Sequence, residues 1–182
     1  DKTMRRSAPA TLALLSLVFG AQAVAQVSEP GDYRRSDYRA PTPATLAGAH
    51  VLTTDEAVAL WRDGEAVFVD VLPRAPKPDN LPEGTIWHPA RRDAIPGSIW
   101  LADTGYGDLA PQTERYFTEG LAKASGGDRA HPLVFYCQRN CWMSWNAARR
   151  AIAMGYTSVA WDPDGTDGWS QAGQPLQPHE PQ

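Results

Sequence analysis

The residues that this chain lacks exclude several classes of function. No cluster of Lys and Arg is large enough to follow a phosphate backbone, and the 182 residues carry a formal net charge of −4, so we expect no nucleic-acid partner. No apolar run, including the one near the start, is long enough to span a bilayer. Only four histidines and two cysteines are present, and His88 and His131 have no spacing that suits a zinc site. We therefore expect neither a metal nor another cofactor.

The N-terminal segment has the features of an export signal. Residues 1–3 look like an addition that precedes a natural start at Met4. Arg5 and Arg6 then form a basic start, residues 10–19 are apolar, and small residues up to Ala25 suit cleavage by a signal peptidase. A membrane anchor would need roughly 20 apolar residues, and this run is shorter. We expect residues 4–25 to be a signal peptide that directs the protein to the periplasm, with no membrane span after cleavage.

The rest of the chain is expected to form one α/β domain with a flanking segment at each end. Residues 26–49 are polar and contain several prolines, which indicates an irregular arm along the surface. Residues 50–176 alternate short apolar runs with amphipathic segments, which predicts a parallel sheet with helices on both faces, and residues 177–182 form a tail. We expect strands at 50–52, 66–71, within 95–101, at 133–136 and at 158–161. We expect one helix from Thr53 or Thr54 to before Gly64, a second at 113–124, and a third that follows the cysteine turn and ends at 154. Residues 162–182 are expected to be irregular.

Both cysteines lie in one turn between a buried strand and a helix. Leu133–Tyr136 is a short apolar run typical of a buried strand, and an Ala-rich segment follows the turn. A thiol at the end of a strand and just before a helix faces unpaired backbone N–H groups and the positive end of the helix dipole, and both favour the thiolate. Because ligands bind at the carboxyl ends of parallel strands, Cys137 marks a candidate site.

Four features, in this order, resemble a rhodanese domain over roughly residues 51–175. They are the strand Val67–Val71, the segment Ile95–Ile99, the strand, loop and helix around Cys137, and an ending that runs from Gly155-Tyr156 through Gly165 and Trp169 to Ala172-Gly173 and Pro175. The resemblance implies a rhodanese-like parallel sheet with helices on both faces. It also implies an active loop in which Cys137 takes up a sulfane sulfur as a persulfide.

A narrower resemblance concerns the motif Cys137-x-x-x-Cys141-Trp142 in an exported chain. It is similar to the periplasmic family described as PQQ-dependent catabolism-associated CXXCW motif proteins. That family is associated with alcohol oxidation by quinoprotein dehydrogenases. The resemblance therefore implies a periplasmic quinoprotein dehydrogenase system as a candidate partner, and it implies no particular reaction.

The chain departs from the rhodanese pattern around the loop. The loop is one residue longer than the usual loop of rhodanese sulfurtransferases. Met143 stands where rhodanese-fold phosphatases place an Arg to hold phosphate, so phosphatase activity is not expected. Leu72 replaces the Arg commonly found two residues after the Asp of the first buried strand, with Arg74 as a candidate substitute. These departures weaken the case for ordinary thiosulfate chemistry.

Three hypotheses for the loop remain open. In the first, Cys137 attacks a small sulfur-containing anion or thiol donor and carries a persulfide. Arg139 adds positive charge and Ser144 caps the helix. The residues expected to bind the anion or substrate are Gln138, Arg139, Asn140, Trp142, Met143 and Ser144. In the second, Cys137 forms a reversible disulfide with Cys141, which acts as the resolving thiol.

The third hypothesis is a permanent Cys137–Cys141 disulfide in a binding or accessory module that presents Trp142 and Trp145 to a partner. A disulfide that closes so short a loop constrains little chain entropy, so it would be a poor structural device. This argument favours the two hypotheses with thiol chemistry over a purely structural disulfide.

Two other segments allow alternative interpretations. The Pro-rich excursion over 72–94 could cover the active loop as a lid or remain a solvated loop, and the candidate lid residues are Trp87, His88, Arg91 and Arg92. Residues 162–168 superficially resemble a calcium loop, but the Gly and the distal Glu of an EF-hand are out of register. Haem attachment would need a His after the second cysteine, where Trp142 stands.

Overall fold

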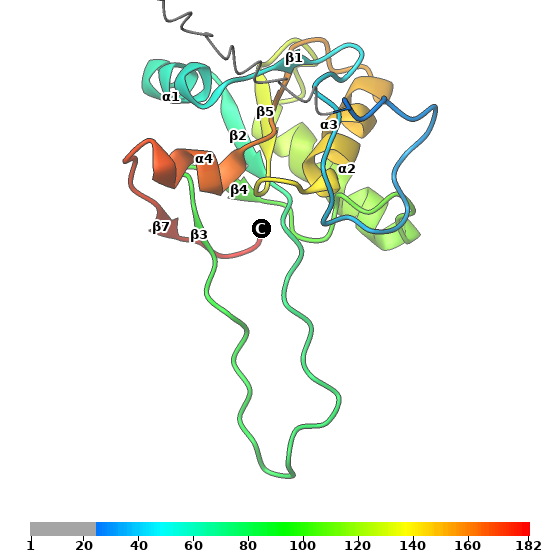
Figure 1. Cartoon of the computed structure of the whole chain (residues 1–182), viewed down its shortest axis with the longest axis vertical. Coiled ribbons are helices and arrows are strands. Elements are labelled where there is room, and N and C mark those ends of the chain that lie inside the picture. The colour runs from blue at the N-terminus through cyan, green and yellow to red at the C-terminus, as the bar shows by residue number, and fades with distance from the viewer. Residues whose placement is uncertain (1–24) are drawn as a thin grey trace, which may run out of the picture.

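A five-stranded parallel sheet forms the centre of the structure, a computed structural model that describes residues 25–182 (Figure 1). The strands lie side by side in the order β1-β6-β5-β2-β4. Their bounds are His50–Val51 for β1, Val67–Asp70 for β2, Ile99–Trp100 for β4, Leu133–Tyr136 for β5 and Val159–Asp162 for β6. The predicted α/β class with a parallel sheet is confirmed. Cys137 follows β5, the central strand.

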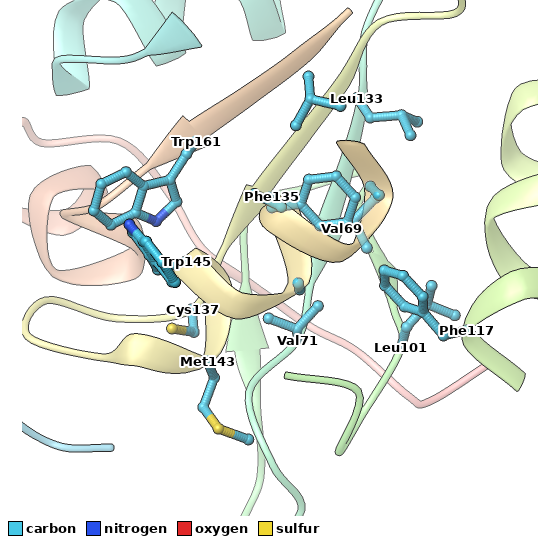
Figure 2. Packing of buried hydrophobic residues seen from close by; sticks show 14 of the residues in the cluster. Val69, Val71, Leu101, Phe117, Leu133, Phe135, Cys137, Met143, Trp145 and Trp161 are labelled. Atoms are coloured by element: carbon cyan, nitrogen blue, oxygen red, sulfur yellow. The ribbon is translucent and has the colours of Figure 1, made fainter. Parts of the chain in front are cut away.

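Helices cover both faces of this sheet. The strand side chains alternate between the faces, so Val69 packs with Phe117 and Trp145 in one core, whereas Phe68 packs with Trp169 in the other. The first core lies under α2 (Pro111–Ser125) and α3 (Trp142–Ala153), and the second lies under α1 (Thr54–Asp63) and α4 (Gly165–Gln171). Figure 2 shows the first core, in which Phe135 and Trp161 come from neighbouring strands.

Local signals set the ends of α1 where the sequence predicts them. Thr53 is the N-cap, and its side chain accepts a hydrogen bond from the Glu56 N–H while the Glu56 carboxylate accepts one from the Thr53 N–H. Gly64 ends the helix in a left-handed conformation, with φ of 72°. The predicted helix and its two boundaries are confirmed.

The C-terminal part is more regular than the sequence suggests. Residues 162–182 were expected to be irregular, but they contain α4 and β7 (Gln177–Pro178), which pairs antiparallel with β3 (Asp93–Ala94). The expectation is wrong for α4 because its glycines are there for close packing: a Cβ on Gly168 would lie 2.4 Å from Thr54 Oγ1 of α1. The final residue is also tied down, since the Gln182 N–H donates to the Trp100 carbonyl oxygen at 3.0 Å.

The N-terminal arm and the excursion take different courses. The arm does follow the surface, but it also covers α3, and Leu46 within it is only 4% exposed. Between β2 and β3 the excursion extends away from the sheet as a long irregular loop with an outgoing and a returning segment (Figure 1). Its residue Ile86 is 81% exposed.

Within residues 25–182, no helix has the length and apolarity needed to cross a membrane. The proposed signal peptide lies almost entirely outside the described residues.

Candidate thiol site at the end of the central strand

Cys137 continues the inward alternation of β5 and is buried beneath α3. Its side chain belongs to the same core as Phe135 and Trp145, and the residue is only 1% exposed. Figure 2 shows its sulfur at the end of the strand, close to Trp145. The thiol donates a hydrogen bond to the Cys141 carbonyl oxygen, with a sulfur–oxygen distance of 3.5 Å. Cys137 therefore sits in the core under the loop.

Cys141 occupies a different environment at the start of α3. It is the N-cap residue of that helix, where the unpaired N–H groups and the helix dipole stabilise negative charge. It is buried, with 2% exposure, but it lines a pocket of about 360 Å³ that Cys137 does not line. The pocket gives Cys141, rather than Cys137, a route to a small molecule.

The two thiols have different surroundings, and these separate their pKa values. Burial raises the pKa of Cys137 well above that of an ordinary thiol, and the hydrogen bond with Cys141 raises it further. The pKa of Cys141 is lowered to about 7, first by the interaction with the Cys137 side chain and then by backbone N–H groups of Met143 and Gln138, with Arg39 adding a favourable charge. Cys141 therefore ionises more readily than Cys137.

The Arg139 side chain is directed toward α4 and not toward the thiols. Arg139 was expected to add positive charge beside Cys137, but its guanidinium donates to Asp164 Oδ1 at 3.0 Å and to Gln171 Oε1 at 2.8 Å. Its backbone N–H donates to Asp167 Oδ2 at 2.9 Å. These bonds attach the loop to α4 and occupy two carboxylates of the superficial calcium motif, those of Asp164 and Asp167. Asn140 has φ of 53°, a left-handed conformation that Asn tolerates and that turns the loop.

Three residues at the start of α3 differ from their expected roles. Ser144 does not cap the helix, because its hydroxyl faces the core and accepts a hydrogen bond from Trp161 Nε1 at 3.0 Å. Trp142 and Trp145 are 1% and 0% exposed, so neither is presented to a partner as the binding-module hypothesis requires. Met143 and Gln138 do line the pocket beside Cys141. Two residues of the expected cradle therefore line this pocket.

The candidate lid residues do not cover the cysteine pocket. Arg92 is held below the loop by a bidentate ion pair with buried Asp70, at 2.7 and 3.0 Å, and it also donates to the Cys137 carbonyl oxygen at 3.2 Å. His88 and Arg91 line a separate pocket of about 490 Å³, and Trp87 lines neither pocket. The lid interpretation is wrong in placement, because the other end of the excursion, residues 72–76, is the part beside Cys141.

The N-terminal arm supplies functional residues that the sequence did not reveal. Arg39 forms a β-bridge with Cys141, and its guanidinium donates to the Arg139 carbonyl oxygen at 2.9 Å. The Trp142 N–H donates to the Tyr38 carbonyl oxygen at 2.9 Å. The two Tyr-Arg pairs of the arm were visible in the sequence, but nothing in their local pattern indicates contact with residues about a hundred positions away.

The comparisons with known proteins agree with this architecture. The model of the rhodanese-like domain matches residues 53–172, so the chain belongs to the rhodanese-like domain family. Membership supports a sulfur-transfer or thiol role in general. No curated protein matches the chain.

Several solved structures are similar in fold. A thiosulfate sulfurtransferase from Pseudomonas aeruginosa shares 21% identity over 74% of this chain with a TM-score of 0.49, and this chain spans only 21% of its length. A polysulfide-sulfur transferase homodimer from Wolinella succinogenes shares 18% identity over 72% of this chain and 80% of its own, with a TM-score of 0.45. A protein of unknown function from Rhodopseudomonas palustris, described as a possible tyrosine phosphatase, shares 24% identity over 72% and 86% of the two chains, with a TM-score of 0.43.

Proposed function

We propose that this protein is an exported thiol enzyme that transfers sulfur, and forms a reversible disulfide, through Cys141 and Cys137. The observation that carries the proposal is that only Cys141 lines the 360 Å³ pocket, while the Cys137 thiol lies beneath it and donates to the Cys141 carbonyl oxygen at 3.5 Å. The pKa of Cys141 is also lowered to about 7. A nucleophilic thiol must be accessible and ionised, and Cys141, which lines the pocket and has the lower pKa, satisfies these conditions better than Cys137. The roles first assigned from the sequence, with Cys137 as nucleophile, are therefore exchanged.

The proposed reaction begins with a sulfane-sulfur donor of the form R–S–SH. The Cys141 thiolate attacks the terminal sulfur, a new sulfur–sulfur bond forms, and the donor leaves as a thiolate. Cys137 then attacks the Cys141 sulfur of the persulfide, and the proton of its thiol passes to the departing outer sulfur. This step forms the Cys137–Cys141 disulfide and releases hydrogen sulfide. Two equivalents of a small thiol, oxidised to their own disulfide, restore the reduced pair.

Mass spectrometry of tryptic peptides tests this division of roles. Cleavage after Arg139 places Cys137 in peptide 130–139 and Cys141 in peptide 140–149, so the two cysteines are read separately. After brief exposure of the reduced protein to a persulfide donor, Cys137→Ser should hold one added sulfur on peptide 140–149. Cys141→Ser should hold none. The wild type should progress to cross-linked peptides that mild reductant separates.

The same experiment distinguishes the alternatives. If Cys141→Ser takes up sulfur on peptide 130–139 at the wild-type rate, Cys137 is the nucleophile and our assignment is wrong. If neither variant takes up sulfur and the wild-type disulfide resists mild reductant, the domain is a binding module with a structural disulfide. That outcome would reject both transfer and thiol redox chemistry.

Export and the link to quinoprotein dehydrogenases complete the proposal. The basic start, the apolar run of residues 10–19 and the cleavage signal before Gln26 support export to the periplasm. The Cys137-x-x-x-Cys141-Trp142 motif supports a role alongside PQQ-dependent alcohol oxidation. Export predicts a mature N-terminus at Gln26 in the periplasmic fraction. The metabolic link predicts that a strain without the protein grows poorly on an alcohol oxidised by a quinoprotein, and that Cys141→Ser does not restore growth.

A further inference from the structure

The pocket beside Cys141 is large and mostly apolar for an inorganic sulfur donor. Its volume of about 360 Å³ falls in the range of pockets that hold small organic ligands. Leu72, Pro73 and Pro76 form one wall, and Met143 contributes a thioether from the loop. A small, strongly hydrated anion such as thiosulfate would fill a fraction of this space and would lose solvation against apolar walls.

Two tyrosines from distant parts of the chain form a second wall. The rings of Tyr38 and Tyr106 pack edge to face, with centroids 5.4 Å apart and an interplanar angle of 81°. The Tyr38 hydroxyl accepts a hydrogen bond from the Gly107 N–H at 3.2 Å, which fixes the ring in place. Tyr106 remains 36% exposed, so its ring is available to a ligand. Aromatic walls of this kind favour an organic group.

The charge of the pocket has one sign. The charged residues that line it are Arg39 and Arg74, and no Asp or Glu lines it in the described part of the chain. Arg74 is paired with Asp103, at 3.3 Å. Arg39 bonds only a carbonyl oxygen and has no carboxylate partner within residues 25–182. Its guanidinium is therefore the cation that remains available to an anionic ligand.

We propose that this pocket binds an organic thiol or persulfide with an apolar body and an anionic group such as a carboxylate, and that Arg39 binds the anionic group. The sulfur of the ligand then lies against Cys141. The inference rests on the proposed function of Cys141, and it adds the substrate class and the residue that selects it. Arg39 comes from the N-terminal arm, so the arm is part of the substrate site.

Alkylation rates test the charge preference without any sulfur transfer. Iodoacetate and iodoacetamide differ in charge and deliver similar groups, and both attack the same thiolate. Any change in the pKa of Cys141 cancels in the ratio of their rates on peptide 140–149. We expect Arg39→Gln to lower the ratio of iodoacetate to iodoacetamide by about fivefold, the effect of losing one partly solvent-exposed ion pair. Arg39→Lys should keep most of the ratio.

A matched control separates the local effect from net charge. Arg62 is exposed on α1 and does not line the pocket, so Arg62→Gln removes one charge and should leave the ratio unchanged. An equal fall in Arg62→Gln and Arg39→Gln would show only long-range attraction, and no fall in Arg39→Gln would show that Arg39 binds no anion. Either result overturns the proposal. The iodoacetamide rate itself reports whether each variant keeps the loop intact.

A second pair of reagents tests the apolar wall. We expect N-phenylmaleimide to modify Cys141 faster than N-methylmaleimide, and Tyr106→Ala to reduce that preference by about threefold through loss of aromatic contact. An unchanged preference in Tyr106→Ala would reject the organic substrate class. These rates also separate the two proposals. If the reagent selectivity is as expected but the protein takes up no sulfur, the binding site is supported and sulfur transfer is rejected. If the protein takes up sulfur but shows no reagent selectivity, sulfur transfer is supported and the proposed binding site is rejected.

Discussion

Breaking the Asp70–Arg92 ion pair should destabilise the domain far more than breaking the neighbouring Arg91–Asp93 pair. Asp70 and Arg92 have side chains that are 0% and 10% exposed, and two hydrogen bonds of 2.7 and 3.0 Å join them. In Arg92→Met, the Asp70 carboxylate stays buried with the Leu72 N–H as its hydrogen-bond donor, and His179 Nε2 lies 3.6 Å from Asp70 Oδ2. Removing one partner of a buried ion pair typically costs about 3–5 kcal/mol.

Urea unfolding curves and thermal melts of the reduced protein measure the effect. A loss of this size corresponds to a fall in melting temperature of roughly 10 °C for a domain of this length. The side chains of Arg91 and Asp93 are 67% and 44% exposed, so Arg91→Met should cost less than about 1 kcal/mol. The double variant Asp70→Asn/Arg92→Met should be more stable than Arg92→Met, because it no longer buries an unpaired charge. Equal losses in Arg92→Met and Arg91→Met would refute the reasoning.

Three further predictions concern ionisation and the packing of the loop. Alkylation of Cys141 should rise with pH around a midpoint of about 7, while peptide 130–139 stays unmodified, because burial keeps Cys137 protonated. Burial raises the pKa of Asp162 to about 7, so the folded state holds a proton that the unfolded state releases, and stability should fall as pH rises from about 4 to about 7; Asp162→Asn should flatten this slope in urea titrations. Gly165→Ala should destabilise more than Gly173→Ala by equilibrium unfolding. Both glycines have positive φ, but only at Gly165 would a Cβ meet the Cys137 carbonyl oxygen, at 2.5 Å.

The sequence predicts the fold where the signal is local. The Thr53 capping box, the Gly64 stop and the buried run of β5 each depend on residues within a few positions, and each appears as expected. The position of the cysteine loop at the end of a parallel strand follows from the same patterns. The helix α4 was missed because its two glycines have low helix propensity, and their use for close packing against other elements leaves no trace in the local pattern.

The structure of the site depends on contacts that local patterns do not carry. The arm docks on α3 through backbone carbonyl oxygens, such as that of Thr45, which accepts from Trp145 Nε1 at 3.2 Å. Every residue has a carbonyl group, so the sequence does not mark the ones that are used. Asn146 similarly joins the arm and the segment after β4, since its side-chain amide donates to the carbonyl oxygens of Arg34 and Gly105. The sequence could place the thiols but not their surroundings.

In the proposed mechanism, the surroundings of the two thiols decide which one reacts. A Cys at the end of β5 inherits the inward direction of Phe135, so Cys137 is directed into the core whatever the loop does. The second Cys begins α3, where backbone N–H groups favour its thiolate and the arm brings Arg39 against it. Leu72 and Met143 remove two arginines that the rhodanese pattern would place near the loop. Arg92 now holds Asp70 and the loop backbone from below, and Arg39 supplies positive charge at the pocket. The charge at the site is thus set by the arm and the excursion, so changes in these two segments should alter selectivity while leaving the parallel sheet in place.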